Sequence, residues 1–153
     1  MTSVDLRRAT PDDVAPIERI AAAAFTPYVE RMGGMRPGPL DADYAALVAE
    51  AETWVADADG EVVGFLVLMW EDDGVLLDTV AVPPARQGTG LGRRLLELAE
   101  QRARVRGCRR IRLYTHATMV ENQRLYERSG YAVTRSAAED GFSRVFYEKR
   151  LSP

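Results

Sequence analysis

Residues 87–92 read Gln-Gly-Thr-Gly-Leu-Gly, and Arg93 and Arg94 follow them. An apolar run at 76–82 precedes the stretch and an amphipathic segment at 93–107 follows it, so the glycines fall where a strand passes into a helix. The start of a helix presents unpaired N–H groups and the positive end of its dipole. Glycines let a phosphate approach that backbone closely and permit backbone angles that other residues avoid. We therefore expect this loop to bind a pyrophosphate, and a tight turn without a ligand is the alternative.

Two common nucleotide-binding patterns do not fit this loop. The dinucleotide fingerprint Gly-x-Gly-x-x-Gly, counted from Gly88, needs its third glycine at the position of Arg93. A P-loop needs a lysine and then a serine or threonine after its last glycine, and two arginines follow Gly92. Neither a Rossmann dinucleotide site nor a P-loop site is expected.

A third pattern does fit. Gln-x-x-Gly-x-Gly at 87–92, entered by a strand that ends Val-Ala-Val-Pro at 80–83, resembles the acyl-CoA loop of the GNAT superfamily of N-acetyltransferases. Residues 125–131, Leu-Tyr-Glu-Arg-Ser-Gly-Tyr, resemble the Leu-Tyr-Glu-Lys-Leu-Gly-Phe motif on the last helix of that family. The order of the expected elements is similar over nearly the whole chain. The resemblance implies transfer of an acetyl group from acetyl-CoA to a primary amine, by direct attack in a ternary complex.

The resemblance also implies how coenzyme A binds. Backbone N–H groups of residues 88–93 would contact the pyrophosphate, and the pantetheine arm would lie in a gap between strands 75–82 and 109–116. The residues implied for acetyl-CoA binding are Val80, Ala81, Val82, Gln87, Gly88, Thr89, Gly90, Leu91, Gly92, Arg93, Asn122 and Tyr126.

One position departs from the family pattern. Many members carry an asparagine seven residues before the motif tyrosine, and this chain has Met119 there. Asn122 lies one helical turn before Tyr126 on the same face and is expected to do related work, with a solvent-facing helix residue as the alternative. Tyr126 matches the family position that protonates the departing thiolate. Its alternative role is that of a buried aromatic residue whose hydroxyl has a structural partner.

The sequence leaves the general base open. The amine must lose a proton before or during attack, which calls for a nearby acceptor of protons. Asp78 shares a strand with the expected pantetheine contacts, and His116, the one histidine, ends the strand beside the gap. Glu30, in a loop rich in glycine and proline, and a chain of water molecules are further candidates.

The amine acceptor is expected to bind between 26–40, the first part of 41–52 and the loop 137–141. Its expected contacts are Tyr28, Glu30, Arg31, Met32 and Tyr44, with Met35 and Phe142 also lining the site. Arg31 and Arg36 are candidates for holding an acceptor carboxylate, although a surface role is equally compatible with their sequence context. A small molecule, an amino acid and a peptide all remain open as acceptors. The alternative function is a non-catalytic acyl-CoA-binding sensor or regulatory domain.

These residues depend on elements that hydrophobic periodicity indicates. Strands are predicted at 4–9, 53–58, 61–70, 75–82, 109–116, 131–136 and 142–151. Helices are predicted at 14–25, 41–52, 93–107 and 119–130. With the resemblance, they imply an α/β (α+β) fold in which about seven strands form a mixed, mostly antiparallel sheet flanked by about four helices. The sheet would splay between 75–82 and 109–116.

Composition limits the class of protein. A length of 153 residues favours one domain over 1–153, and a net charge of −3 is unlike that of a nucleic-acid-binding protein. One cysteine, Cys108, cannot form an internal disulfide, which favours a cytoplasmic location. The first ten residues lack the apolar core of a signal peptide, and no apolar run reaches the ~18 residues of a membrane span. No metal, nucleic-acid partner or membrane partner is expected, and the resemblance leaves a homodimer open.

Overall fold

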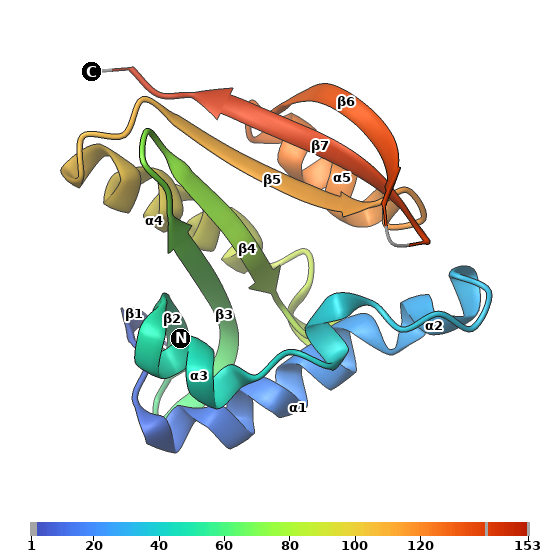
Figure 1. The fold of residues 1–153 in the computed structure, drawn as a ribbon. Helices are drawn as coiled ribbons and strands as arrows, with labels where there is room; N and C mark the ends of the chain where they lie inside the picture. Colours follow the sequence, from blue (N-terminus) through green and yellow to red (C-terminus); the bar gives the residue numbers. More distant parts are fainter. Residues whose placement is uncertain (1–2, 140, 153) are drawn as a thin grey trace.

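Seven strands form one sheet in the computed structural model, which describes residues 3–139 and 141–152 (Figure 1). The strands are β1 (Val4–Arg8), β2 (Glu52–Ala58), β3 (Glu61–Trp70), β4 (Val75–Ala81), β5 (Arg110–His116), β6 (Ala132–Glu139) and β7 (Phe142–Arg150). Their order across the sheet is β1-β2-β3-β4-β5-β7-β6. Neighbouring strands are antiparallel except β4 and β5, which are parallel. This mixed, mostly antiparallel sheet confirms the predicted fold class.

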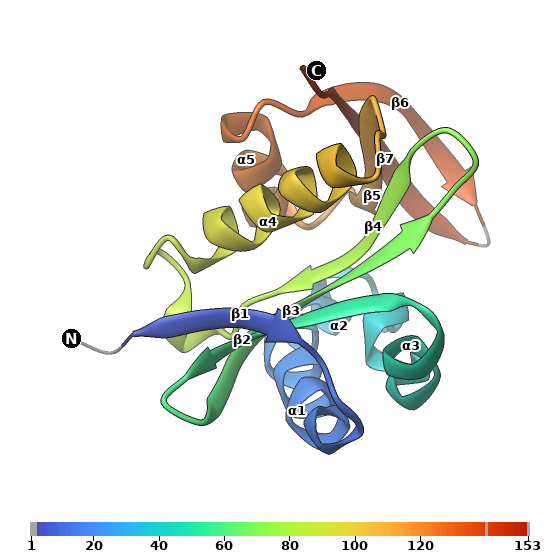
Figure 2. The same ribbon diagram turned by 90° about the vertical axis from the view of Figure 1, so that its left-hand side faces the viewer.

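Helices cover both faces of the sheet. They are α1 (Val14–Phe25), α2 (Pro27–Arg31), α3 (Tyr44–Glu50), α4 (Leu91–Val105) and α5 (Val120–Arg128). Figure 2 shows α4 and α5 on one face and α1 and α3 on the other. The core is divided in the same way, with Leu95 and Ala99 of α4 packed on one side and Ile17 and Ile20 of α1 on the other. None of the helices in the described ranges is long and apolar enough to cross a membrane.

The sheet separates between β4 and β5, as predicted. These two strands pair only through Val75 with Ile111 and Leu76 with Arg112, and then diverge (Figure 1). The register between β3 and β4 shifts by one residue at this point, so that Asp78 is the extra residue of a β-bulge. The bulge bends β4 away from β5, and the main chain of β4 beyond Leu76 has no strand partner in β5.

Three boundaries differ from the predicted ones. The helix predicted at 41–52 is shorter, because Asp43 caps the start of α3 with its side chain. Helix α4 begins two residues earlier than predicted, at Leu91, which is buried in the core. The loop predicted at 137–141 is mostly strand, because β6 continues into it. Asp140, which falls within that predicted loop, lies outside the described residues.

A buried ion pair fixes α4 against the sheet. The side chain of Glu52 on β2 is 5% exposed and accepts hydrogen bonds from Arg102 at 2.7 and 3.1 Å. The indole of Trp54 donates a third bond to this carboxylate at 2.9 Å. Since the pair holds the C-terminal half of α4, it helps to keep the N-terminus of the same helix at the end of β4.

Candidate active site

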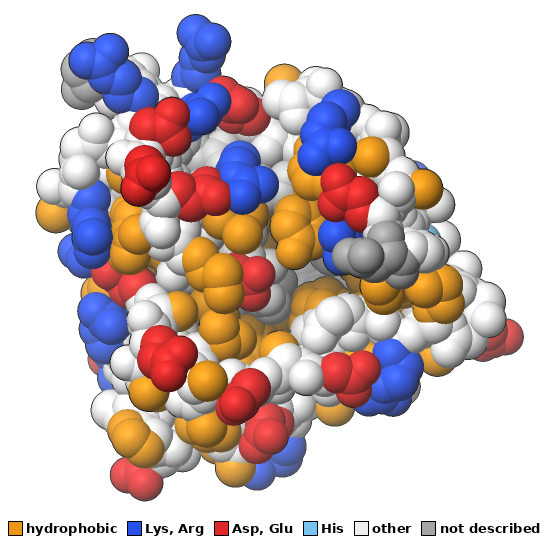
Figure 3. Space-filling model, in the orientation of Figure 1, with side chains coloured by type: hydrophobic (Ala, Val, Ile, Leu, Met, Phe, Trp, Pro, Cys, Tyr) orange, Lys and Arg blue, Asp and Glu red, His pale blue; other side chains and the backbone are white. Residues whose placement is uncertain are grey.

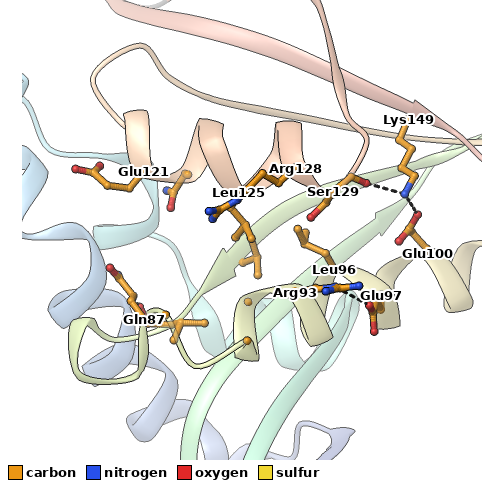
Figure 4. Close-up of a pocket in the computed structure, with 16 residues that line it drawn as sticks. Gln87, Arg93, Leu96, Glu97, Glu100, Glu121, Leu125, Arg128, Ser129 and Lys149 are labelled. Carbon is orange, nitrogen blue, oxygen red and sulfur yellow. Dashed lines mark hydrogen bonds and ion pairs between the residues drawn. The ribbon is translucent and has the colours of Figure 1, made fainter.

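A groove runs between α4 and α5 and ends at the splay of the sheet (Figure 4). The cavity has a volume of about 760 Å³. It is lined by Val80, Val82, Gln87, Gly88, Gly90, Gly92, Arg93, Leu96, Glu97, Glu100, Glu121, Asn122, Leu125, Arg128, Ser129 and Lys149. Figure 4 shows Arg93 of α4 and Arg128 of α5 on opposite sides of the groove, so both walls offer a cation to an anionic ligand.

The three glycines of the loop have different physical roles. Gly88 and Gly90 adopt φ angles of +81° and +86°, which residues with a side chain rarely adopt. Gly92 lies in the first turn of α4, where a Cβ atom would approach the Leu125 side chain to 3.1 Å. Two glycines therefore shape the loop, and the third lets α4 pack closely on α5.

The start of α4 offers donors to a ligand in the groove. The first hydrogen bond of the helix runs from the N–H of Arg94 to the carbonyl of Gly90. The N–H groups of residues 91–93 come before that bond and have no partner within the helix. The Gln87 side chain donates to the carbonyl of Val82 at 3.2 Å, which ties the loop to the end of β4. An unpaired helix start beside a loop of this shape is a favourable place for a phosphate.

Most of the residues predicted for acetyl-CoA lie on this groove. Val80, Val82, Gln87, Gly88, Gly90, Gly92, Arg93 and Asn122 all line it. The side chains of Ala81 and Leu91 are buried in the core instead, and the Thr89 hydroxyl donates to the carbonyl of Arg86. Tyr126 faces a second cavity. Sequence reasoning missed groove residues that α5 and β7 contribute, Glu121, Leu125 and Lys149. The recognisable pattern covers the loop and not the surface that faces α4.

A second cavity, of about 270 Å³, lies on the other side of the splay. Its lining is Phe25, Met32, Pro37, Gly38, Pro39, Ala42, Asp78, Thr79, Val80, Tyr114, Thr115, His116, Met119, Asn122, Tyr126, Phe142 and Arg144. Figure 3 shows this face of the molecule hollowed between its two halves, with hydrophobic side chains around the hollow. Val80 and Asn122 line both cavities, so the two meet at the point where β4 leaves β5.

The three residues predicted for catalysis, Asp78, His116 and Tyr126, all line the second cavity. Burial raises the pKa of the Asp78 carboxyl above its ordinary value, and a 3.1 Å hydrogen bond from Thr79 offsets part of this effect. Burial also raises the pKa of Tyr126. The tyrosine therefore stays protonated, and its hydroxyl makes no hydrogen bond to another described residue. The cavity thus holds one proton acceptor of increased basicity and one protonated hydroxyl.

His116 is held as a neutral ring. Its Nδ1 accepts a hydrogen bond from the Thr118 N–H at 3.1 Å, so Nδ1 carries a lone pair. Burial and the neighbouring Arg144 lower the pKa of the imidazole. In this neutral tautomer the proton is on Nε2, and the ring presents a donor to its surroundings.

The predicted acceptor contacts lie in different places. Met32 lines the second cavity, and Glu30 is exposed on α2. Tyr44 is buried against Phe65 in the core, with its hydroxyl bonded to the main chain of η2 (Gly38–Leu40). Tyr28 and Arg31 point to α5. The predicted segment 26–40 does border the cavity, through Met32 and residues 37–39.

Tyr28 and Arg31 form a latch between α2 and α5 by binding one carboxylate, that of Glu121. The Tyr28 hydroxyl donates to it at 2.8 Å and the Arg31 guanidinium at 2.8 and 3.0 Å. These bonds lower the pKa of Glu121, and burial together with the Glu121 bond raises the pKa of Tyr28 to about 12. Phe25 and Met32, which flank α2, line the second cavity, and Glu121 lines the groove, so the latch links elements that border the two cavities.

Sequence reasoning also missed several residues of the second cavity. Phe25, Tyr114 and Arg144 come from α1, β5 and β7, and their sequence context resembles that of ordinary core and strand residues. Arg36, a candidate for binding a carboxylate, instead pairs with Asp41 at the surface. Within the described ranges, no group of three His, Cys, Asp or Glu side chains could hold a metal ion.

Comparison with known families agrees with this geometry. The profile of the acetyltransferase (GNAT) family matches residues 17–131, which include the groove loop, the splay and the tyrosine of α5. The chain belongs to the GNAT family. Members of this family are acetyltransferases that use acetyl-CoA, so the predicted family, enzyme class and cosubstrate are confirmed at the level of the family.

Known GNAT structures share the fold of the chain. A GNAT-family acetyltransferase structure from Desulfovibrio desulfuricans is 24% identical, with a TM-score of 0.80 over 98% of this chain and 100% of that one. PaiA N-acetyltransferase of Thermoplasma acidophilum, solved with coenzyme A, is 18% identical, with a TM-score of 0.80 over 97% and 99% of the two chains.

A curated relative matches part of the sequence. Mycothiol acetyltransferase of Beutenbergia cavernae is 32% identical over an alignment of 104 residues that covers 61% of this GNAT chain. The match spans 35% of the length of that relative, about a third of it. The chain therefore matches about a third of a longer protein.

Proposed function

We propose that this GNAT chain transfers the acetyl group of acetyl-CoA to the primary amine of an acceptor, by direct attack in a ternary complex. The observation that carries the proposal is the meeting of the two cavities at Val80 and Asn122. One cavity is lined by the glycine loop at the start of α4, and the other holds Asp78 and Tyr126. A donor and an acceptor that enter from opposite sides would bring a thioester and an amine together at the splay.

The chain's own groups suit the binding of acetyl-CoA. The unpaired N–H groups at the start of α4 would bind the pyrophosphate. The pantetheine arm would pass along the free edge of β4, where main-chain groups have no partner from β5. In the attack, the amine nitrogen forms a bond to the thioester carbon and the carbon–sulfur bond breaks. A main-chain N–H near Val80 is the proposed donor to the developing oxyanion.

We assign the general base to Asp78. Its carboxyl lies in the acceptor cavity, and its raised pKa makes it a stronger base than an ordinary carboxylate. His116 is less suited, because the Thr118 N–H already occupies the lone pair of its Nδ1 and the proton lies on Nε2. Glu30 is exposed and does not line the cavity. Asp78 thus accepts the proton that the amine loses.

Tyr126 is the proposed proton donor to the departing sulfur. Its pKa is raised by burial, so the hydroxyl is protonated at neutral pH and acts as a hydrogen-bond donor. A free thiol has a pKa of about 8.5, so complete transfer from tyrosine to an established thiolate is uphill. The hydroxyl therefore stabilises the charge on sulfur while the carbon–sulfur bond is breaking.

A transfer assay tests this proposal. Purified protein is incubated with acetyl-CoA and a panel of amines, and both thiol release and the mass of the acetylated amine are recorded. The proposal predicts stoichiometric formation of thiol and N-acetylated product that depends on Asp78. Binding of acetyl-CoA without acetylation of any amine supports the sensor function instead. We further propose a cytoplasmic setting, because the single cysteine can form no internal disulfide.

A further inference from the structure

We propose that the acceptor is a small amine that also carries a carboxylate, and that Arg144 binds this carboxylate. The inference rests on the proposed acetyl transfer and concerns the specificity of the same site. Arg144 is a cation on the wall of the acceptor cavity, and it lies outside both the loop motif and the residues that the family profile matches.

Arg144 is held in place by its neighbours. It lies on β7 directly opposite His116 of β5, and its side chain is 22% exposed. The guanidinium carbon lies 4.7 Å from the centroid of the Tyr114 ring and 5.4 Å from that of Phe142. Both rings line the cavity as well. Aromatic contacts on a planar cation restrict its motion and leave its edge for hydrogen bonding.

The local charges leave this end of the cavity positive. The Glu139 carboxylate accepts a hydrogen bond from Nη1 of Arg144 at 3.1 Å and another from Arg135 at 3.3 Å. Among the described residues, two arginines therefore share one carboxylate, and the group carries one net positive charge. Arg135 does not line the cavity, whereas Arg144 does. A guanidinium can bind a carboxylate through two parallel hydrogen bonds, which suits it to an anionic substituent of the acceptor.

The opposite wall has the opposite charge. Asp78 lies on β4 and Arg144 on β7, so the two are on different sides of the splay. Apolar and aromatic side chains, among them Phe25, Met32 and Met119, line the space around them. An amine placed near Asp78 and a carboxylate near Arg144 would match both charges. A plain alkylamine would leave the net positive charge of Arg144, Glu139 and Arg135 unmatched, and a polyamine would bring a second cation towards it.

The size of the cavity favours a small acceptor. Its volume of about 270 Å³ is near the lower end of ligand pockets, which are typically about 300–1,000 Å³. Arg31 and Arg36 do not line the cavity, and each forms a one-to-one ion pair at the surface, with Glu121 and with Asp41. Among the described residues, Arg144 is therefore the one arginine on the cavity wall, and it shares its carboxylate partner with Arg135.

Matched pairs of amines test the inference. Each pair consists of an amino acid and its amide, such as phenylalanine and phenylalaninamide or leucine and leucinamide. The measured quantity is the ratio of kcat/KM for the acid to kcat/KM for the amide. We compare this ratio between the wild type, Arg144→Gln, Arg144→Lys and the control Arg150→Gln, which removes an exposed arginine from the end of the same strand. Comparing the ratio between variants cancels the different intrinsic reactivity of the two amines.

The wild type should acetylate at least one acid, and Arg144→Gln should lower the acid-to-amide ratio by about 10- to 100-fold, the usual effect of losing a hydrogen bond to a charged group. Arg144→Lys should recover part of the ratio and Arg150→Gln should leave it unchanged. An unchanged ratio in Arg144→Gln overturns the inference, as does wild-type acetylation of amides or plain amines only. Failure to acetylate any acid while acetyl-CoA binds also counts against it. Failure to bind acetyl-CoA would instead contradict the proposed function.

Discussion

Replacing Asp78 with asparagine should reduce catalysis and stabilise the protein at the same time. Asparagine has nearly the same shape and still accepts the hydrogen bond that the Thr79 hydroxyl donates at 3.1 Å. It cannot take a proton from the amine. General-base catalysis is typically worth about 10²–10⁴-fold, so we expect kcat to fall by this factor. The dissociation constant for acetyl-CoA should change little, since Asp78 does not line the groove.

The same change should raise the free energy of unfolding at neutral pH. Burial raises the pKa of Asp78 in the folded protein above its value in the unfolded chain. The contribution of Asp78 to the free energy of unfolding is therefore most favourable below the pKa that it has in the unfolded chain. This contribution is lost as the pH rises through the higher pKa of the folded protein. At pH 7 the buried carboxylate destabilises the folded protein by about 1.4 kcal/mol for each unit by which its pKa is raised. Asparagine carries no charge and removes this destabilisation. Each kcal/mol corresponds to a rise in Tm of about 2–4 °C for a chain of this size.

Two pH profiles measure these effects. Under conditions in which chemistry limits the rate, wild-type kcat/KM should fall by an additional factor of ten per pH unit below the raised pKa of Asp78. The Asp78→Asn variant should lack this additional fall. The difference in Tm between variant and wild type should be largest at neutral pH and disappear in acid.

Glu50→Gln provides a matched control, because Glu50 is an exposed carboxylate on a neighbouring hollow that also borders Asp78. It should change neither kcat nor the pH dependence of stability. Full kcat in Asp78→Asn, or a lower Tm at pH 7 than that of the wild type, would refute the assignment of Asp78 as a buried base.

Three other substitutions separate catalysis from structure. Tyr126→Phe should lower kcat by about 10²–10⁴-fold with a nearly constant acetyl-CoA Kd, and full kcat would reduce Tyr126 to a packing residue. Tyr28→Phe removes the 2.8 Å hydrogen bond to Glu121 and should reduce the free energy of unfolding by about 0.5–1.5 kcal/mol. It should also raise the KM for the acceptor, and an unchanged KM would mean that the latch does not shape the acceptor site. Arg102→Ala leaves the Glu52 carboxylate buried without its main partner and should cost about 3–5 kcal/mol in urea unfolding, and a loss below 1 kcal/mol would contradict that burial.

The donor side of the site could be predicted from sequence because its signals are local. The pattern at 87–92 fixes a loop shape within six residues, and two of its glycines, Gly88 and Gly90, adopt the required positive φ angles. The apolar run of β4 and the amphipathic face of α4 are equally local. The separation of the two central strands was also predicted, because the short motifs were enough to indicate the family resemblance that implies it.

The acceptor side could not be predicted in the same way. Its cavity combines residues from Phe25 to Arg144, which come together only through the order of the strands. Tyr28 and Tyr44 looked like lining residues, because an aromatic residue in an irregular segment suits a pocket wall and a core position equally well. Their hydroxyls instead bond to Glu121 and to the main chain of Pro39.

Calorimetric titration of Gly90→Glu and Gly90→Ala with acetyl-CoA tests whether the groove between α4 and α5 binds the cosubstrate. Gly90 has a φ angle of +86° and open space where a Cβ would lie, so both variants carry the same backbone strain and only one adds a carboxylate. We predict one binding site in the wild type, weaker binding in Gly90→Ala and no measurable binding in Gly90→Glu, because the carboxylate would repel the pyrophosphate. Binding that is equally tight in folded Gly90→Glu and Gly90→Ala would contradict the assignment of the groove between α4 and α5 to acetyl-CoA.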